Sequence, residues 1–198
     1  MKKIIFDLDD TLYINKELRK KREKAILEFL GKKSRKYKKL KREGYGTIEA
    51  FKKLGFERQE FFKIIKKVPI KLEKDWKLRL IIKKIKKRYE LIVLSNSPRF
   101  CVKKTLKELG IIDLFDKYYC GEDFLYEKPH ELCFFMIKKE DICVGNNFKK
   151  DLEVPKKLGA ITILIGKEEN GLADYEINKI YQIKKILEKI EWSTSIYL

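Results

Sequence analysis

Four short apolar runs, each followed by polar or turn-forming residues, constrain the fold of this chain more than any other feature. Each run is rich in Ile, Val or Leu, as is typical of parallel strands that helices cover on both faces. Helical patterns lie between the runs, so we expect an α/β fold with a doubly wound parallel sheet. In such a sheet, ligands bind at the carboxyl ends of the strands. The runs are Lys3 to Leu8, Leu91 to Leu94, Ile142 to Val144 and Ala160 to Ile165.

The helical patterns are stripes of apolar residues at helical spacing. One stripe ends at Gly110, and another, which contains Pro155, ends at Gly159; glycine is common just beyond a helix end. Pro155 is compatible with a helix if it lies in the first turn, where its missing N–H costs least. A third stripe predicts a C-terminal amphipathic helix. Its members are Ile177, Ile180, Ile183, Leu187 and Ile190.

The segment 14–75 differs from the rest of the chain because it has no strand-like run. Its apolar residues recur at helical spacing, for example at Ile26, Phe29 and Leu30. It interrupts the alternating pattern directly after the first run. We therefore expect residues 1–13 and 76–198 to form an α/β core domain, and residues 14–75 to form an inserted α-helical cap domain over the site at the strand ends.

The chain carries a net charge of +18, from 48 basic and 30 acidic residues. Such a charge favours phosphate-bearing partners through its overall field. The alternative is a purely compositional charge, because an abundance of Lys, Ile and Glu is compatible with a thermophilic source. For the charge of the whole chain, the sequence favours this second interpretation.

Several functional classes are disfavoured by the composition. No stretch is apolar for long enough to span a bilayer, and Asp7 comes too soon for a signal peptide, so we expect a cytoplasmic protein without a membrane partner. The four cysteines form no C-x-x-C pair, which disfavours zinc and dithiol sites and fits reduced, apolar side chains. The single histidine, His130, excludes a histidine-rich metal site.

The first run ends in an acidic cluster, Asp7-Leu8-Asp9-Asp10-Thr11. Carboxylates this close repel one another unless a cation is present. A tight turn would let Asp7 and Asp9 face one pocket, and Mg²⁺ prefers such oxygen ligands and keeps waters for a substrate phosphate. Phosphoryl transfer needs a metal of this kind, a nucleophile and positive groups. The alternative is an acidic turn in which Asp10 or Thr11 caps a helix.

Two further positions are candidates for phosphate binding. The second run ends in Ser95-Asn96-Ser97, where a hydroxyl followed by backbone N–H groups can hold a phosphate oxygen; a simple Ser/Asn turn is the alternative. Lys128 precedes Pro129, which biases the lysine backbone toward an extended conformation. A lysine aimed at the carboxylates would bind phosphate and offset their repulsion. In so lysine-rich a chain, the alternative is an ordinary surface lysine.

The third run is followed by Gly145, Asn146 and, further along, Asp151. Gly145 permits a close approach of the backbone. Asp151 lies at or near an expected helix start, where a carboxylate is favoured by the helix dipole. Its function is therefore either to cap that helix or to serve in the site.

In order and spacing, these motifs resemble those of the haloacid dehalogenase superfamily of phosphatases. The D-x-D-x-T motif of that family matches Asp7 to Thr11, its strand-ending Ser or Thr matches Ser95, and its Lys-Pro pair matches Lys128-Pro129. Its G-D-x-x-x-x-D motif matches Gly145 and Asp151, but Asn146 stands where the first acid belongs. The resemblance covers essentially the whole chain and implies a Rossmann-like core with a helical cap.

The resemblance further implies a Mg²⁺-dependent phosphatase that acts on a small phosphorylated substrate through an aspartyl phosphate. Asp7 would attack phosphorus, and Asp9 would protonate the leaving oxygen and then activate water. Asp151 would support the metal site or pair with Lys128. The implied phosphate-binding residues are Ser95, Asn96 and Lys128. The implied Mg²⁺ ligands are Asp7, the backbone carbonyl of Asp9, Asn146 and Asp151.

The expected cap contains Tyr45-Gly46-Thr47. This stretch resembles the Y-G-T-T segment of the pyrimidine 5′-nucleotidase branch of the superfamily, which has an α-helical C1-type cap. The resemblance implies that Tyr45, Gly46 and Thr47 contact the substrate and that the substrate is a nucleoside monophosphate. The alternative is a plain helix start with Thr47 as the N-cap.

Residues 32–42 hold eight basic residues and no acid. One interpretation is a patch for nucleic acid or a polyphosphate substrate. The other, which the sequence favours, is a solvated helix face, because no recognised nucleic-acid-binding motif accompanies the stretch. Together with Asn146, the stretch keeps open a second hypothesis, a weakly active or inactive phosphate-binding or interaction protein on the same fold. We expect a monomer or a homodimer.

Overall fold

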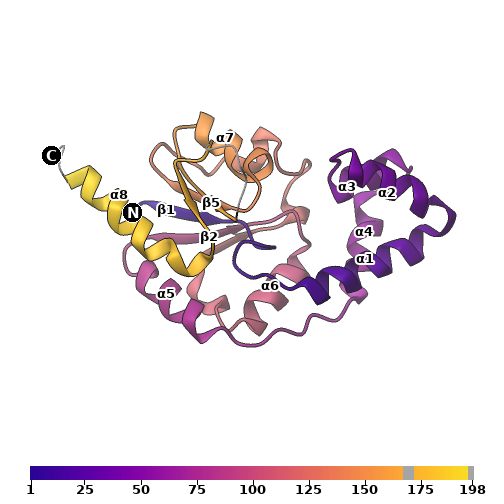
Figure 1. Ribbon diagram of the computed structural model, residues 1–198, viewed down its shortest axis with the longest axis horizontal. Helices are drawn as coiled ribbons and strands as arrows, with labels where there is room; N and C mark the ends of the chain where they lie inside the picture. The colour runs from indigo at the N-terminus through magenta and orange to yellow at the C-terminus, as the bar shows by residue number, and fades with distance from the viewer. Residues whose placement is uncertain (167–171, 196–198) are drawn as a thin grey trace. The chain divides into compact units, whose positions relative to one another are not determined.

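The computed structural model describes residues 1–166 and 172–195, and it contains two compact units (Figure 1). Residues Met1–Ile14 and Leu72–Leu198 form the α/β unit, and Asn15–Lys71 form the helical unit. The sequence pattern sets the second boundary at residue 75, whereas the structure sets it after Lys71. Leu72 packs against the core of the α/β unit, and the Asp75 carboxylate accepts a hydrogen bond from the Leu78 N–H (2.8 Å). These contacts join 72–75 to the α/β unit.

Within the described residues, six parallel strands form one sheet in the order β3-β2-β1-β4-β5-β6. This order confirms the predicted doubly wound fold. The chain builds outward from β1 in one direction and then from β4 in the other, so the carboxyl ends of β1 and β4 lie where the order reverses. The strands are β1 (Lys3–Phe6), β2 (Glu90–Leu94), β3 (Lys117–Tyr119), β4 (Ile142–Gly145), β5 (Ile161–Ile165) and β6 (Tyr175–Ile177).

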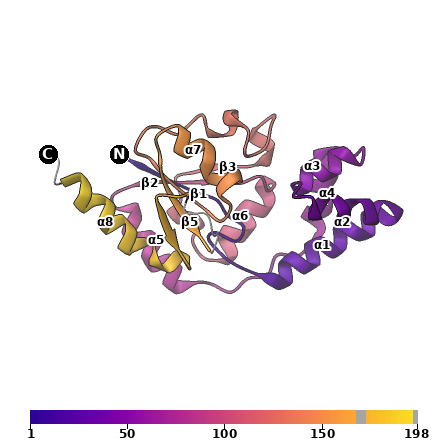
Figure 2. The same cartoon turned by 45° about the horizontal axis from the view of Figure 1, so that its top comes forward.

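Both faces of the sheet are buried, which explains why the central strands are continuously apolar. Ile4 and Phe6 of β1 face one apolar layer, and Ile5 faces the other. Figures 1 and 2 show α5 and α8 on one side of the sheet and α7 on the other. The helices of this unit are α5 (Trp76–Lys86), α6 (Arg99–Glu108), α7 (Glu153–Lys157) and α8 (Ile183–Ser195).

Short helical turns connect these elements. They include the π-helix η5 (Phe148–Leu152), which leads from β4 toward α7. Pro155 is the third residue of α7 and so lies in its first turn, as expected. The other turns are the 3₁₀-helices η2 (Ile112–Leu114), η3 (Gly121–Asp123), η4 (Glu131–Phe134) and η6 (Ile180–Gln182). No helix in the described residues is both long and apolar enough to cross a membrane.

The two edge strands, β3 and β6, have no counterpart among the predicted runs. Each is three residues long, too short to show a clear pattern. The prediction that Ile177 belongs to the C-terminal helix is wrong, because Ile177 lies in β6 opposite Ile165. The preceding segment is held to β5 by Asp174, whose carboxylate accepts hydrogen bonds from the N–H (2.9 Å) and hydroxyl (2.6 Å) of Thr162. The C-terminal helix therefore begins at Ile183.

The helical unit has an aromatic core centred on Phe51, whose side chain is fully buried. Its ring contacts Phe29, Tyr37, Phe56 and Phe61, with centroids 5.6 to 6.2 Å apart. Residues from several helices meet here, so this cluster holds them together. The helices are α1 (Lys16–Leu30), the 3₁₀-helix η1 (Gly31–Lys33), α2 (Ser34–Arg42), α3 (Thr47–Lys53) and α4 (Arg58–Lys67).

Replacing Phe51 should therefore destabilise the helical unit. The substitution Phe51→Ala removes the central ring and leaves a cavity, and we expect a loss of about 3–5 kcal/mol in the free energy of unfolding. Urea unfolding followed by far-UV circular dichroism measures it. Phe62→Ala is the matched control, because Phe62 is only half-buried. Equal losses in the two variants would show that Phe51 is not the centre of this core.

Candidate active site

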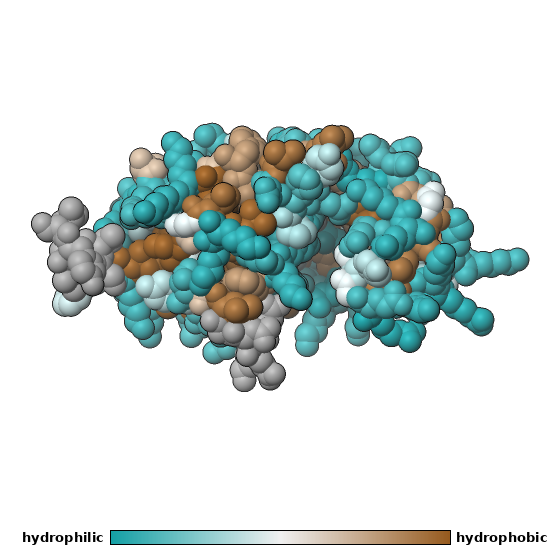
Figure 3. Space-filling model, turned by 90° about the horizontal axis from the view of Figure 1, so that it is seen from above, coloured by the Kyte–Doolittle hydropathy of each residue, from teal (hydrophilic) through white to brown (hydrophobic). Residues whose placement is uncertain are grey.

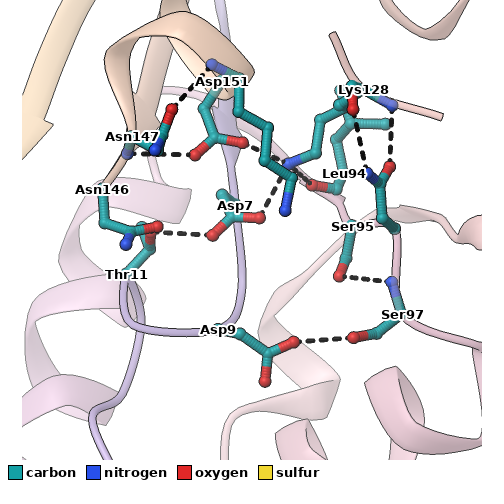
Figure 4. Close-up of polar contacts among 12 residues, drawn as sticks. Asp7, Asp9, Thr11, Leu94, Ser95, Ser97, Lys128, Asn146, Asn147 and Asp151 are labelled. Carbon is teal, nitrogen blue, oxygen red and sulfur yellow. Dashed lines mark hydrogen bonds and ion pairs between the residues drawn. The ribbon is translucent and has the colours of Figure 1, made fainter. Parts of the chain in front are cut away.

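Five of the predicted site residues of the α/β unit converge at the carboxyl edge of the sheet (Figure 4). Asp7 follows β1, Ser95 follows β2, and Asn146 follows β4. Lys128 comes from the connection after β3, and Asp151 lies in η5. Because the strands are parallel and adjacent, residues from distant parts of the chain meet at one point.

Lys128 is the centre of this cluster. Its ammonium donates hydrogen bonds to Asp7 Oδ1 (2.7 Å), Asp151 Oδ1 (2.7 Å) and the Leu94 carbonyl (2.9 Å). The Lys128 side chain is 2% exposed, and the two carboxylate side chains are 9% and 4% exposed. The structure therefore excludes the alternative of an ordinary surface lysine, and Asp151 pairs with Lys128.

Burial and charge set the protonation of this cluster. Burial raises the pKa of Asp7 to about 6, although the Lys128 charge acts in the opposite direction and the Asp151 charge adds to the rise. Burial acts to lower the pKa of Lys128, but the charges of Asp151 and Asp7 outweigh it, and the pKa of Lys128 lies above its usual value. Lys128 therefore stays protonated at neutral pH, and two carboxylates face a single fixed cation.

The turn after β1 directs Thr11 back toward Asp7. Leu8 is fully buried, and its carbonyl accepts the N–H groups of Thr11 (3.3 Å) and Leu12 (3.0 Å). Asp10 has a φ of +63°, a left-handed conformation that Asp adopts more readily than most residues. The Thr11 hydroxyl lies 2.9 Å from Asp7 Oδ2 and 3.4 Å from Asn146 Oδ1. Helix capping by Asp10 or Thr11 is wrong, because α1 begins at Lys16 with Asn15 as its N-cap.

The Asp9 carboxylate points away from the Asp7 cluster (Figure 4). One oxygen accepts a hydrogen bond from the Tyr13 hydroxyl, and the other accepts one from the Ser97 hydroxyl (2.7 Å). The hydroxyl groups of Tyr13 and Ser97 therefore orient the Asp9 carboxylate. Sequence reasoning assigned no site role to Tyr13 or Ser97, and Thr11 entered only as the last residue of the D-x-D-x-T motif. For Tyr13 and Ser97, the one signal was a hydroxyl side chain four positions after Asp9 and two positions after Ser95.

The end of β2 positions the Lys128 connection. The Asn96 side chain accepts a hydrogen bond from the Lys128 N–H (2.9 Å) and donates one to the Lys128 carbonyl (3.2 Å). Asn96, predicted to bind phosphate, therefore holds the lysine backbone in this structure. Ser95 is buried, and its hydroxyl accepts the Ser97 N–H (3.1 Å).

The end of β4 requires glycine. A Cβ at position 145 would lie 2.5 Å from the Cβ of Asp151, closer than side chains can approach. The cap of η5 is Asn147, whose side chain accepts the Lys150 N–H (2.9 Å). Asp151 therefore does not serve as the cap, and its Oδ2 accepts the Asn147 N–H (3.3 Å).

The donor atoms in this cluster fit a hard cation. Among residues 1–166 and 172–195, no three His, Cys, Asp or Glu side chains form a metal cluster. Mg²⁺, however, needs only one or two carboxylates and otherwise takes neutral oxygens, waters and substrate phosphates. The carboxylates of Asp7 and Asp151 and the amide oxygen of Asn146 are all oxygen donors, and the Lys128 charge leaves the ion cluster with a net charge of −1.

The three predicted substrate residues of the cap lie in the helical unit. Tyr45 is half-buried, with Lys53 Nζ 4.5 Å from its ring centroid and Lys41 Nζ donating to its carbonyl (2.8 Å). Gly46 is the N-cap of α3, and Thr47 is its first residue. The N-cap role considered for Thr47 is thus wrong.

Comparison with known proteins identifies relatives of the chain. The family model described as haloacid dehalogenase-like hydrolase matches residues 4–165. The glyceraldehyde 3-phosphate phosphatase of Methanocaldococcus jannaschii is 31% identical over 99 residues, which is 43% of this chain and 43% of the relative. The chain therefore matches less than half of the length of that curated relative.

Solved structures share the fold. A HAD phosphatase from Thermococcus onnurineus has 24% identity and a TM-score of 0.58, over 94% of this chain and 98% of that one. A HAD-hydrolase from Bacillus subtilis bound to magnesium has 16% identity and a TM-score of 0.64, over the same shares. At these identities, the likeness concerns the fold alone.

The raised pKa of Asp7 predicts a pH-dependent cost to stability. In the unfolded chain this carboxyl titrates near 3.8, and in the native state near 6. Its contribution to stability is therefore complete below pH 3.8 and is lost as the pH rises through about 6. Residue 7 cannot ionise in Asp7→Asn. Between pH 4 and pH 8, the free energy of unfolding of this variant should therefore rise relative to that of the wild type, by at most about 3 kcal/mol. Urea unfolding with EDTA at each pH measures this trend.

Asp116→Asn provides a control of opposite sign. Although burial acts to raise the pKa of Asp116, the hydrogen bond from the Leu91 N–H and the Lys86 ammonium hold it below the usual value. Asp116 therefore stabilises the protein above its unfolded pKa, and Asp116→Asn should lose stability relative to the wild type as the pH rises. If the stability of both variants relative to the wild type changed in the same direction as the pH rises, the trend in Asp7→Asn would not come from the raised pKa of Asp7.

Proposed function

The chain belongs to the haloacid dehalogenase-like hydrolase family, and on this basis we propose that it is a phosphatase that hydrolyses small phosphate monoesters through a phosphorylated Asp7. The observation that carries the proposal is the buried ammonium of Lys128, 2.7 Å from both Asp7 and Asp151. A phosphoryl group on Asp7 would meet a fixed positive charge, which is what phosphoryl transfer requires of a protein. The match to a phosphatase from Methanocaldococcus jannaschii supports the same reaction class.

The proposed reaction has two steps. In the first, a carboxylate oxygen of Asp7 bonds to phosphorus while the bond to the ester oxygen breaks, and Asp9 gives its proton to the departing alcohol. In the second, a water oxygen bonds to phosphorus while the bond to Asp7 breaks, and Asp9 takes the proton from that water. The products are the alcohol and inorganic phosphate, and both aspartates return to their starting states.

The surrounding side chains suit these roles. Hydrogen bonds from Tyr13 and Ser97 orient the Asp9 carboxylate for its proposed role as acid and base. Lys128, whose backbone is fixed by Asn96, would bind the phosphoryl oxygens together with Ser95.

We propose Mg²⁺ as the cofactor. Its ligands would be Asp7, the backbone carbonyl of Asp9 and Asn146, with Asp151 in support. Mg²⁺ supplies positive charge to the phosphoryl oxygens when it is bound. The oxygen-only donor set supports this cofactor, as does the magnesium in the Bacillus subtilis HAD-hydrolase.

For the substrate we propose a nucleoside monophosphate, with Tyr45, Gly46 and Thr47 as specificity residues. The support is the Tyr45-Gly46-Thr47 segment and the two lysines at Tyr45. Glyceraldehyde 3-phosphate is the competing candidate, from the name of the Methanocaldococcus jannaschii relative. Relative kcat/KM values on a panel of nucleotides and sugar phosphates distinguish the two.

The four buried, free cysteines fit a reducing compartment, and we propose a cytoplasmic location.

Asp7→Asn should abolish hydrolysis of an aryl phosphate, because an amide cannot form the acyl phosphate. We expect a fall in kcat of at least about a thousandfold, with the fold intact by circular dichroism. Asp10→Asn is the matched control, since it removes a neighbouring carboxylate without a proposed role, and Asn also tolerates the left-handed backbone found there. Substantial turnover by Asp7→Asn, after deamidation and contaminating phosphatase are excluded, would remove Asp7 from the nucleophile role.

Asn146→Asp should lower the Mg²⁺ concentration that gives half-maximal rate, on the order of tenfold, because a carboxylate adds a negative charge to the site. Asn147→Asp is the matched control. It adds the same charge one residue away, and Asp caps a helix as well as Asn does. If Asn146→Asp and the wild type behave alike, Asn146 is not a ligand. A wild type that is inactive at every Mg²⁺ concentration, beside an active Asn146→Asp, would favour the phosphate-binding protein instead.

A further inference from the structure

The positive charge of this protein is concentrated in the helical unit. Residues 15–71 hold 21 basic and 7 acidic residues, a net charge of +14, whereas the α/β unit carries the remaining +4. A compositional bias alone would spread the charge along the chain. It does not explain why little more than a quarter of the residues hold most of the net charge. The interpretation that the sequence favoured for the overall charge therefore fails for the helical unit.

The centre of this charge is a surface that we call the basic face, formed by Lys32, Arg35, Lys36, Lys38 and Arg42 of η1 and α2. All five side chains are exposed. Within the described part of the chain, none of the five forms an ion pair. Long hydrophilic side chains project from the helical unit at the right of Figure 3. The basic face is thus an uncompensated array of cations.

Acidic residues elsewhere in the helical unit do pair with neighbouring lysines. On α1, Glu17 lies 2.7 Å from Lys21, and Glu28 lies 3.8 Å from Lys24. The basic face differs because its stretch contains no acid between residues 32 and 42. Mutual repulsion of unpaired cations destabilises a helix. The presence of five such cations along one short helical segment therefore points to an anionic ligand that binds them.

We infer that the basic face binds the phosphate backbone of a nucleic-acid duplex. The nine residues of α2 span ~14 Å, and a duplex presents one phosphate for about every 1.7 Å of its axis. A polyanion of this density can engage all five cations at once, whereas a small phosphorylated metabolite can engage only one or two. The proposed recognition is of phosphates rather than bases, and it is independent of the phosphatase chemistry of the α/β unit.

Two other polyanionic surfaces fit the basic face less well. Membrane-surface helices place apolar side chains in the bilayer, but the apolar residues of α2, Tyr37 and Leu40, are buried in the helical unit. Single-stranded nucleic acid is bound largely by stacking of bases on aromatic side chains. The basic face contains no aromatic residue, so a duplex is the favoured ligand.

The test is fluorescence anisotropy of a labelled 20-base-pair DNA duplex titrated with the full-length protein between 50 and 200 mM KCl. For the wild type, we expect log K to fall with log[KCl] with a slope of about −4.5, the value for five phosphate contacts. The variant Lys32→Gln/Arg35→Gln/Lys36→Gln/Lys38→Gln/Arg42→Gln should bind at least tenfold more weakly at 50 mM KCl and show a much shallower slope. Its circular dichroism should match the wild type, and its urea midpoint should be equal or higher, because the repulsion among the five cations is removed.

The matched control removes five exposed lysines from the α/β unit. The variant Lys83→Gln/Lys84→Gln/Lys87→Gln/Lys103→Gln/Lys107→Gln loses the same charge and should change duplex affinity less than threefold. Equal losses in the two variants, or no binding by the wild type to either a DNA or an RNA duplex at 50 mM KCl, would overturn the proposal. So would tighter binding to phosphatidylserine vesicles or to a single strand than to the duplex. A duplex RNA of the same sequence identifies which nucleic acid the face prefers, and binding to either duplex supports the proposal.

Discussion

The buried contact of one lysine with two aspartates is the interaction on which the rest of the α/β unit depends. The ammonium of Lys128 is shared by Asp7 and Asp151 at 2.7 Å each. Loss of Lys128 would leave two carboxylates buried without compensation, at a cost of about 3–5 kcal/mol. The three side chains come from the end of β1, the connection after β3 and the turn after β4. Three features bring these side chains together. They are the strand order, the close approach of the backbone at Gly145, and the two hydrogen bonds between Asn96 and the Lys128 backbone.

The same cluster also determines what the site can bind. Two carboxylates and one ammonium leave a net negative charge, which attracts a hard cation, and the ammonium offers a fixed donor to an anion. Together these properties suit a phosphate held between a metal ion and a lysine. Asn146 gives this member of the haloacid dehalogenase-like hydrolase family a neutral oxygen where its motif otherwise has an acid. A neutral amide adds nothing to the net charge of −1 that Asp7, Asp151 and Lys128 leave at the site.

The two units divide the electrostatics of the chain between them. In the α/β unit, a few charges are buried and paired, and their effect is local because burial strengthens each contact. In the helical unit, many charges of one sign are exposed and unpaired, and their combined field reaches beyond the surface. A net charge of +18 for the whole chain conceals this difference. It becomes visible only when the charges are counted over the units that the fold defines.

The sequence by itself determined the doubly wound sheet, the four central strands and the position of the site residues at the strand ends. These features are local, because the burial of a strand appears as a continuous apolar run and the turn after it appears in the next few residues. The features that depend on pairing between distant parts of the chain were decided by the tertiary structure. It gave β3 and β6 their place at the sheet edges, joined 72–75 to the α/β unit, and directed Asn96 to the Lys128 backbone. It also separated Asp9, with Tyr13 and Ser97, from Asp7. Polar side chains choose partners by distance in space, and a single sequence contains no record of those distances.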